Sequence, residues 1–384
     1  MRAAVMYDVD DIRIEERPVP ALASGDVLVA TAASGVCSGD LMPWYVRKKA
    51  PFVFGHEPAG TVVAIGGDAA GAGRDGGRVA LGARVFAHHH APCLNCDACV
   101  AGRYVHCATW RTTALEPGGM AEFFRVPRAN LADTLTLPAA VSFADGSLVE
   151  PLACVVKSLR RAFPIEIERR LVPPESDDAL AAGGAFIASA QSALLAATDG
   201  LCERTLYVIG AGVMGLMHVA VAAALGARVF ASDFNAARRE AALRLGAAAA
   251  FDPAAAPQAL AAATGGHGAD VVICGPGHAV ALAAAVDAVR ADGTVLMFTP
   301  IEPDERFALD QSRAYFRDVR LVASYSCGPD DTVEALRLIR RGIVTAERLE
   351  ATTFPFPGVA AAYAAMQQAE VVKGIVTFPT PALS

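Results

Sequence analysis

Residues 206–215 read LYVIGAGVMG, an apolar run followed by three glycines in the spacing G-x-G-x-x-G. The four apolar residues before Gly210 are typical of a buried strand, and the alanine-rich sequence after the last glycine is typical of a helix. A glycine turn between a strand and a helix lets backbone N–H groups approach a pyrophosphate at the positive end of the helix. The stretch therefore predicts a dinucleotide site. Its candidate residues are Gly210, Gly212, Val213, Met214 and Gly215.

Strands and helices alternate along the chain after this turn. The expected strands cover residues 206–209, 228–233, 270–274, 294–299 and 320–325, and the expected helices cover 213–225 and 279–290. Alternation of this kind predicts a parallel doubly wound sheet. Further on we expect a helix from Asp330 to Arg341, with Asp330 as its N-cap and Gly342 at its end. A tail of short strands over residues 352–378 is expected to rejoin the N-terminal part.

The N-terminal part, up to about Glu150, has a different pattern, in which short strands are separated by Gly, Pro and Asp turns. Strands are expected over residues 12–16, 27–31 and 61–65. A chain of 384 residues is long enough for about two domains. Residues 161–203 match neither pattern and carry no motif, so we treat them as an unassigned insert with one expected helix over 185–197.

The composition excludes several classes of protein. Hydrophobic residues make up 54% of the chain and charged residues 19%, which is too apolar for an intrinsically disordered protein. The formal net charge of -7 has the wrong sign for neutralising nucleic-acid phosphates. Apolar runs such as 219–225 are shorter than the roughly 20 residues of a membrane span, and residues 1–10 lack the apolar core of a secretory signal. We therefore expect a cytoplasmic protein with no nucleic-acid or membrane partner.

Four of the nine cysteines lie close together in the spacing C-x2-C-x2-C-x7-C. Four thiolates on one tight loop can enclose a tetrahedral zinc ion. Such a site has a net charge of about -2 and no open coordination position, so its zinc stabilises the fold and takes no part in catalysis. The sequence predicts a structural zinc site at Cys93, Cys96, Cys99 and Cys107.

Three further segments flank this loop in the sequence: GVCSGD at residues 35–40, GHEP at 55–58 and LVEPL at 148–152. Together with the later glycine turn, they resemble the medium-chain zinc-dependent alcohol and polyol dehydrogenases over nearly the whole chain. The resemblance implies an α/β protein with a GroES-like β-rich catalytic domain over 1–152 and 327–384, and a Rossmann domain over 153–326. It also implies an active site in the cleft between the two domains and a homodimer or homotetramer.

The resemblance further implies that Cys37 and His56 bind a catalytic zinc, and that Glu57 is an adjacent carboxylate able to bind it or move aside. Glu150 is at the position of the family's third protein ligand. A zinc with one thiolate, one neutral imidazole and one carboxylate is neutral, whereas a second carboxylate gives a charge of about -1 and opposes ionisation of an alcohol. We therefore expect one glutamate at a time. Asp40 resembles the carboxylate that orients the zinc histidine, unless it is an ordinary turn residue.

The sequence departs from the family at the proton relay. Relatives usually have Ser or Thr two residues after the zinc cysteine, where this chain has Gly39, and some have His where this chain has Met42. The proton must then leave through Ser38, Tyr45, Glu57 or water, and we rank Ser38 first.

Asp233 ends the strand after the glycine turn. A carboxylate there accepts hydrogen bonds from the adenosine ribose and repels a 2′-phosphate, so NAD is favoured over NADP. Arg238 and Arg239 favour NADP unless they are ordinary exposed helix charges.

For the other residues that could take part in chemistry, packing or surface roles are weighed against functional ones. His88, His89 and His90 are expected to pack or to lie at the surface. The cysteines without ligand spacing are treated as small apolar residues; these are Cys154, Cys202, Cys274 and Cys327. The run from Arg47 to Lys49 is a solvated charge run unless the substrate is anionic. The aromatic residues near the motifs either line a pocket or pack in the core; these are Trp44, Tyr45 and Trp110.

The sequence thus predicts a zinc-dependent oxidoreductase that transfers a hydride between NAD and a secondary alcohol, polyol or sugar-derived alcohol. Two alternatives stay open. One is a non-catalytic relative that binds zinc and nucleotide, and the other is a reductase of an activated C=C or C=N bond.

Overall fold

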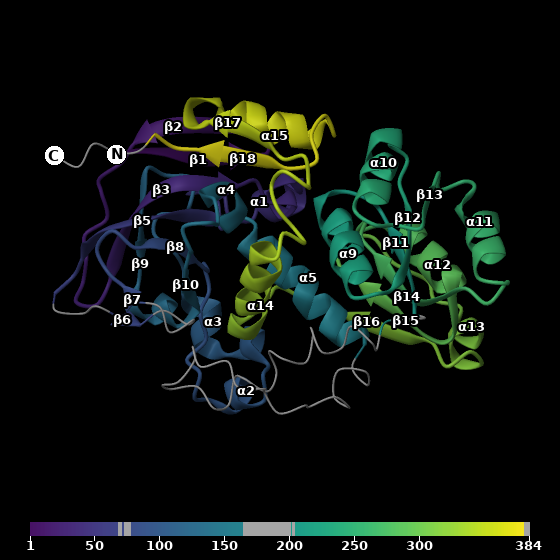
Figure 1. Cartoon of the computed structure of the whole chain (residues 1–384). Helices are drawn as coiled ribbons and strands as arrows, with labels where there is room; N and C mark the ends of the chain where they lie inside the picture. The colour runs from purple at the N-terminus through teal and green to yellow at the C-terminus, as the bar shows by residue number, and fades with distance from the viewer. Residues whose placement is uncertain (68–70, 73–77, 164–200, 202–203, 380–384) are drawn as a thin grey trace. The chain divides into compact units, whose positions relative to one another are not determined.

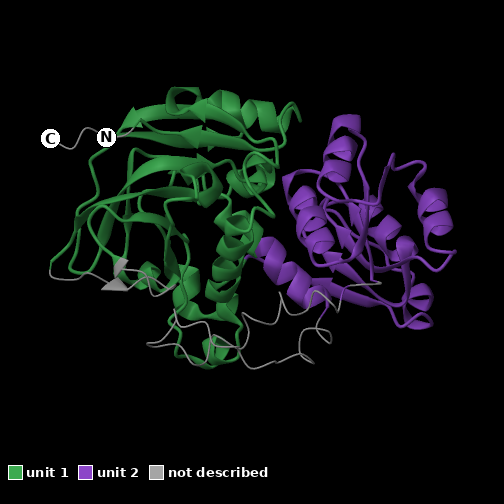
Figure 2. Ribbon diagram, in the orientation of Figure 1, with its two compact units in different colours: residues 1–153, 327–384 green, residues 154–326 purple. Residues whose placement is uncertain are grey.

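The computed structural model describes residues 1–67, 71–72, 78–163, 201 and 204–379. The chain divides into two compact units (Figure 2). Unit 1 comprises Met1–Ala153 and Cys327–Ser384, and unit 2 comprises Cys154–Ser326. The helix expected over residues 185–197, and most of the unassigned insert around it, lie outside the described residues. Within the described part, no helix has both the length and the apolar character that crossing a membrane requires.

Unit 1 is rich in strands (Figure 1). A seven-stranded sheet has the order β10-β8-β5-β3-β18-β17, with β9 also paired to β3; a smaller sheet has the order β2-β1-β4, and β6 pairs with β7. The strands are β1 (Arg2–Asp8), β2 (Asp11–Glu16), β3 (Val27–Gly35), β4 (Phe52–Val53), β5 (Pro58–Ile65), β6 (Gly71–Ala72), β7 (Arg78–Val79), β8 (Arg84–Ala87), β9 (Phe123–Val126), β10 (Thr134–Thr136), β17 (Thr352–Pro355) and β18 (Gly374–Thr377).

The central strand of this sheet is β3, which is buried along almost its whole length because its residues are small or β-branched. β18 pairs with it in antiparallel register, Ile375 opposite Gly35. Two C-terminal strands, β17 and β18, therefore complete a sheet whose other strands lie between Val27 and Thr136. A core cluster beside this pairing includes Val36, Phe54 and Tyr363.

The helices of unit 1 are mostly short. They are η1 (Ser38–Leu41), α1 (Pro43–Val46), α2 (Asp97–Val100), η2 (Tyr104–His106), α3 (Ala108–Thr112), η3 (Arg128–Asp133), α4 (Phe143–Gly146), α14 (Pro329–Arg340), η4 (Phe356–Gly358) and α15 (Val359–Gln367). Helix α5 (Val149–Ala162) runs across the boundary between the two units.

The expectation that Asp330 caps α14 is wrong. Gly328 is the N-cap, because Pro329, which has a fixed φ and no N–H to satisfy, takes the first helical position. Asp331 closes the cap by accepting the Gly328 N–H at 3.0 Å. Asp330 instead accepts the hydroxyl of Tyr104 at 2.7 Å.

Unit 2 contains a six-stranded parallel sheet of order β13-β12-β11-β14-β15-β16 within the described residues, which confirms the predicted α/β class. Helices α9 and α10 lie on one face of this sheet, and α11 and α12 lie on the other (Figure 1). The strands are β11 (Thr205–Ile209), β12 (Arg228–Ser232), β13 (Ala249–Phe251), β14 (Ala269–Cys274), β15 (Val289–Met297) and β16 (Arg320–Ala323). The helices are α9 (Val213–Ala224), α10 (Ala236–Arg244), α11 (Ala256–Ala263), α12 (Ala279–Ala288) and α13 (Gln311–Tyr315).

Candidate active site and metal centres

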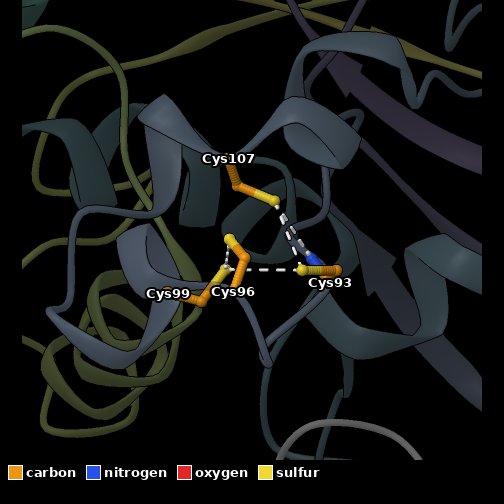
Figure 3. A group of neighbouring side chains, drawn as sticks. All are labelled: Cys93, Cys96, Cys99 and Cys107. Atoms are coloured by element: carbon orange, nitrogen blue, oxygen red, sulfur yellow. Dashed lines mark hydrogen bonds between the residues drawn. The ribbon is translucent and has the colours of Figure 1, made fainter.

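The four clustered cysteines converge on one point (Figure 3). The Sγ–Sγ distances are 3.9 Å for Cys93–Cys99, 3.5 Å for Cys96–Cys99 and 3.6 Å for Cys107–Cys93. A tetrahedron with Zn–S bonds of about 2.3 Å has sulfurs about 3.8 Å apart. The spacing of the sulfurs therefore fits a zinc ion bound by four thiolates.

Backbone hydrogen bonds lower the pKa of two of these cysteines, Cys93 and Cys107, whereas burial raises that of Cys99. Burial acts to raise the pKa of Cys107, but backbone N–H groups of Cys93 and Trp110 donate to its sulfur and lower its pKa to about 6. Trp110 is buried and packs against Cys99 and Cys107, so it belongs to the core of this loop. The geometry of this loop fits the structural zinc site expected from its spacing.

A second group of ligand atoms comes from Cys37, His56 and Glu57, whose donor atoms all lie within 4.8 Å of one another. Cys37 lies two residues after the end of β3 and is the N-cap of η1. Its sulfur accepts the Gly39 N–H at 3.3 Å. His56 and Glu57 directly precede β5. A thiolate, an imidazole and a carboxylate form a typical catalytic zinc donor set, because three protein ligands leave a coordination position open.

The charges of this group are strongly coupled. Burial acts to lower the pKa of His56, but the negative charges of Cys37 and Asp40 outweigh it and hold the pKa well above its usual value. Burial raises the pKa of Cys37 and of Asp40. Asp40 Oδ2 lies 3.7 Å from His56 Nδ1 and has no hydrogen-bond partner among the described residues. A divalent cation at this point would supply the positive charge that these buried groups need.

Glu57 is held by a residue that sequence reasoning missed. Lys373 Nζ donates to Glu57 Oε2 at 2.5 Å and to the carbonyl oxygen of Val36 at 2.8 Å, and both charged side chains are about 1% exposed. A Cβ on Gly35 would lie 1.9 Å from Glu57 Oε2, so glycine is required there for space. Lys373 immediately precedes β18, and no local pattern in the sequence links it to Glu57.

Glu150 lies in the first turn of α5 and is nearly fully buried. Burial raises its pKa, while the positive charge of His56 opposes the rise and the negative charge of Glu57 adds to it. Its carboxylate belongs to a third group of ligand atoms, with His88 and Cys327, all within 4.8 Å of one another. From the sequence, His88 was expected to pack or to lie at the surface, and Cys327, which lacks ligand spacing, was interpreted as a small apolar residue.

The surroundings of His56 contain a further group without a sequence signal. The ring of His89 lies 4.8 Å from the ring of His56, and its Nδ1 has no partner among the described residues. The ring of His90 lies 4.2 Å from that of Trp110. In the charge run, Lys48 Nζ lies 4.9 Å from the centroid of the Trp44 ring, and Lys49 Nζ lies 3.7 Å from that of the Tyr45 ring.

The glycine turn of unit 2 has the form that a dinucleotide requires. Gly210 has a φ of +87°, and a Cβ on Gly215 would lie 1.9 Å from the Gly210 carbonyl oxygen. A Cβ on Gly212 would meet nothing within 4 Å, which leaves a cradle open at the N-terminus of α9. Val213 and Met214 form the first turn of that helix.

The carboxylate of Asp233 is tied to this turn. Its two oxygens accept the N–H groups of Ala211 and Asn235, each at 2.8 Å. Arg238 Nη1 lies 4.0 Å from one of these oxygens. The Arg239 guanidinium donates hydrogen bonds to the carbonyl oxygens of Asp233 and Phe234, so it binds the backbone of this loop.

Comparison with known proteins agrees with this arrangement. Residues 23–138 match the alcohol dehydrogenase GroES-like domain family, and residues 213–341 match the zinc-binding dehydrogenase family. The chain belongs to the medium-chain zinc-binding alcohol and polyol dehydrogenase family. Membership makes it an NAD(P)-dependent zinc dehydrogenase that acts on alcohols or polyols.

Individual members of the family match over almost their whole length. A probable D-xylulose reductase A of Emericella nidulans is 26% identical, with 98% of this chain and 96% of the relative covered. The L-galactonate-5-dehydrogenase of Escherichia coli is 27% identical, with 98% and 99% covered.

Solved structures show the same fold. A protein of Sinorhizobium meliloti 1021, described as a zinc-binding dehydrogenase and solved with NADP, has a TM-score of 0.77 at 25% identity, with 98% of each chain covered. An alcohol dehydrogenase of Escherichia coli CFT073 solved with NADH has a TM-score of 0.77 at 22% identity, with 98% and 99% covered.

Proposed function

We propose that this dehydrogenase oxidises a secondary hydroxyl of a polyol or sugar-derived substrate with NAD. The observation that carries the proposal is the convergence of Cys37, His56 and Glu57 on one point. The substrate class is supported by relatives named for D-xylulose, L-galactonate and sorbitol, the last being a Bacillus subtilis sorbitol dehydrogenase at 27% identity over 305 residues.

The roles follow from the contacts of each side chain. A zinc ion held at this site would supply a Lewis acid that lowers the pKa of the substrate hydroxyl, and a bound nicotinamide would supply the hydride acceptor. Cys37 and His56, with Glu57 as the carboxylate, hold the metal, and the Gly39 N–H supports the charge on the Cys37 sulfur. Asp40 orients His56. Ser38, which begins η1 beside Cys37, is the first choice for carrying the proton away, ahead of Tyr45, Glu57 or water.

The choice of NAD rests on Asp233. Its carboxylate is fixed beside the glycine turn, where a 2′-phosphate on the ribose would meet its negative charge. Arg238 lies next to it and is the residue through which NADP would be accepted once that charge is removed. Solved relatives carry either NADP or NADH, so the two cofactors have to be compared on this chain. Replacing Asp233→Ser is expected to raise the NADP to NAD ratio of kcat/KM by about tenfold or more, corresponding to about 1.4 kcal/mol.

The test of the reaction is an NAD-coupled screen over polyols, sugar acids and secondary alcohols, with zinc content measured on the same sample. Replacing Cys37→Ala is expected to lower turnover by more than about 100-fold and to leave the fold intact, because Cys37 is only partly buried and lies beyond the end of β3. Replacing Cys93→Ser is expected to unfold the cysteine loop. Cys274→Ala, at a buried cysteine of unit 2, is the matched control. Reduction of an activated C=C or C=N bond, with no alcohol oxidised, would overturn the proposal.

We also infer that the enzyme is a homo-oligomer. In the six-stranded sheet, β16 is an edge strand, and Tyr315 and Phe316, just before it in the sequence, are 65% and 81% exposed. An edge strand beside exposed aromatic rings is a surface that a second copy can cover. Light scattering of the purified protein measures the assembly state, and Phe316→Ser is expected to weaken it. A monomer at all concentrations would contradict the inference.

A further inference from the structure

Four aromatic rings of unit 1 form a row between the four-cysteine loop and the candidate catalytic metal site. The ring centroids of Trp110 and His90 are 4.2 Å apart, and those of His90 and His89 are also 4.2 Å apart. The row ends at His56, whose ring centroid is 4.8 Å from that of His89. Aromatic rings this close attract each other beyond the effect of the area that they bury. We call Trp110, His90, His89 and His56 the ring row.

The four-cysteine loop fixes the first ring of the row. Trp110 is 2% exposed and packs in one cluster with Cys99 and Cys107. Cys107 is the N-cap of α3, the short helix that contains Trp110, and its sulfur accepts the backbone N–H of Trp110. A Cys107 sulfur held in the loop therefore also holds the start of α3. The position of the Trp110 ring thus depends on the position of that sulfur.

The other end of α3 fixes the second ring. Thr113 is the C-cap of this helix, and its carbonyl oxygen accepts a hydrogen bond from His90 Nδ1 at 2.7 Å. The Ala91 N–H donates to the Thr113 hydroxyl oxygen at 2.8 Å. Burial lowers the pKa of His90 to about 4, so its ring is neutral in neutral solution and packs against other rings without carrying a charge. Helix α3 therefore holds His90 through both the Trp110 ring and Thr113.

Packing places the third ring, that of His89. Successive side chains of an extended strand point to opposite sides, but the chain bends at His89 after the end of β8, and the His89 and His90 rings meet. The Asn130 side chain fixes this bend by donating to the carbonyl oxygens of His88 and His89 at 3.0 and 3.1 Å. The Nδ1 atom of His89 is buried and has no hydrogen-bond partner in the described part of the chain. The rings of His56 and His90 on either side therefore define where the His89 ring lies.

His56 gains support from this row. The distance of 3.7 Å from its Nδ1 to Asp40 Oδ2 is longer than a hydrogen bond, so in this structure the carboxylate alone does not fix the ring. A histidine that binds a metal has to aim one ring nitrogen at the ion, and the groups behind the ligand set that orientation. The His89 ring packs against the imidazole and limits its rotation.

We propose that the ring row holds His56 in the orientation that catalysis requires, and that His90 is a positioning residue that acts through His89. The proposal rests on the metal-binding role proposed above for His56. It gives the four-cysteine loop a second task, because the loop anchors the row at Trp110 in addition to stabilising the fold. His90 contacts neither the substrate nor the metal in this proposal.

The first test is spectroscopic and needs no substrate. The chain has eight histidines, so a carbon–hydrogen correlation spectrum of the labelled imidazole rings in the full-length, zinc-loaded enzyme is simple, and His56→Gln identifies the His56 signal. His90→Leu removes one ring of the row and is expected to shift that signal, whereas His90→Phe keeps a ring there and should shift it less. His267→Leu, at an exposed histidine of unit 2, is the control and should leave it in place. An unmoved His56 signal in His90→Leu, or an equal shift in His90→Phe, overturns the proposal.

The second test is kinetic and uses the substrate found in the alcohol screen. His90→Leu is expected to lower kcat by about threefold to tenfold, the change to which the loss of one aromatic pair corresponds, with KM and zinc content unchanged. His90→Phe should keep at least about half of kcat, because a ring remains in the row. A loss of zinc from His90→Leu, or an equal fall of kcat in both variants, would contradict a positioning role.

A double-mutant cycle tests the link to the cysteine loop. Trp110→Leu and His90→Leu interrupt the same row, so the doubly substituted enzyme is expected to lose about as much kcat as the more damaging single variant. Losses that multiply would mean that the two residues act independently, against the proposal. If the enzyme oxidises no alcohol, the proposed function fails, whereas the His56 signal still decides whether the row positions this histidine.

Discussion

The catalytic carboxylate depends on single residues far from it in the sequence. Glu57 is buried against Lys373, and Gly35 leaves the space that the carboxylate occupies. A buried carboxylate without a partner is costly, whereas a buried ion pair with a further hydrogen bond, here to the Val36 carbonyl, is tolerated. Lys373 and Gly35 thus fix the position of the Glu57 carboxylate beside His56.

The first prediction concerns this ion pair. Lys373→Met leaves Glu57 buried without its positive partner, and we expect the free energy of unfolding to fall by about 3–5 kcal/mol. Urea denaturation followed by circular dichroism measures the loss. Lys48→Met, at an exposed lysine of the same unit, is the control and should change stability by less than about 0.5 kcal/mol. Equal stability of the two variants would show that the pair contributes nothing.

A second prediction concerns pH and rests on His218 in α9. Burial lowers the pKa of His218 from 6.5 to about 4. Its Nδ1 is hydrogen-bonded to the Met214 carbonyl oxygen and its Nε2 to the Ser158 hydroxyl, each at 2.7 Å. Between pH 6.5 and about 4 the unfolded chain binds a proton at this residue and the folded chain does not. The free energy of unfolding therefore falls as the pH falls through this window, by about 1.4 kcal/mol per pH unit for this one group.

Replacing His218→Gln removes the titrating group and should flatten that part of the stability profile. Urea midpoints of both proteins, measured from pH 7 to pH 4.5, provide the comparison. A slope that is the same in the variant would mean that other groups account for the acid sensitivity.

Secondary-structure elements with a local signal were predicted well. The strand β11, the glycine turn and the start of α9 were confirmed to within a residue, because an apolar run, three glycines and a helix follow one another without interruption. Strand β13 was missed since it has only three residues, two of them alanine. The predicted helix over 279–290 ends earlier, at Ala288, because the chain enters β15 at Val289.

The residues of the candidate site also differ in whether a local sequence pattern predicts them. The four cysteines are close in sequence and their spacing alone indicates a metal loop, whereas Cys37, His56 and Glu150 became meaningful only through the family resemblance. Lys373 has no local pattern, because it gains its role from Glu57, a partner that only tertiary folding brings near.

The third prediction separates the roles of two glycines in the turn. Gly215→Ala places a Cβ against the Gly210 carbonyl oxygen and should destabilise unit 2 by about 1–3 kcal/mol. Gly212→Ala meets nothing within 4 Å, so we expect it to fold normally yet to bind NADH at least about tenfold more weakly, because its methyl group enters the open cradle. Thermal unfolding and NADH fluorescence titration measure the two effects. Normal binding by Gly212→Ala would place the pyrophosphate elsewhere.

At the scale of the whole molecule, the two units differ in how the chain builds them. Unit 2 is continuous in sequence, whereas unit 1 needs residues on both sides of it. The C-terminal segment contributes β18, which pairs with β3, and core side chains such as Phe356 and Tyr363.

The fourth prediction follows from this construction. A chain ending at Ser326 loses the partner of β3 and the C-terminal part of the core, so unit 1 is expected to be unfolded, while unit 2 keeps all six of its described strands. A 15N correlation spectrum should show dispersed signals from residues 204–326 and collapsed signals from residues 1–153. A chain ending at Pro379, which retains both C-terminal strands, is the comparison. Dispersed signals from both units in the shorter chain would contradict the expectation.

The position of Lys373 has a consequence for biosynthesis. A ribosome makes Glu57 316 residues before it makes the lysine that balances its charge. During elongation the carboxylate must stay hydrated or protonated, so a nascent chain cannot assemble a finished catalytic centre. Termination before Lys373 therefore yields products without an ordered centre, and activity requires synthesis through this lysine.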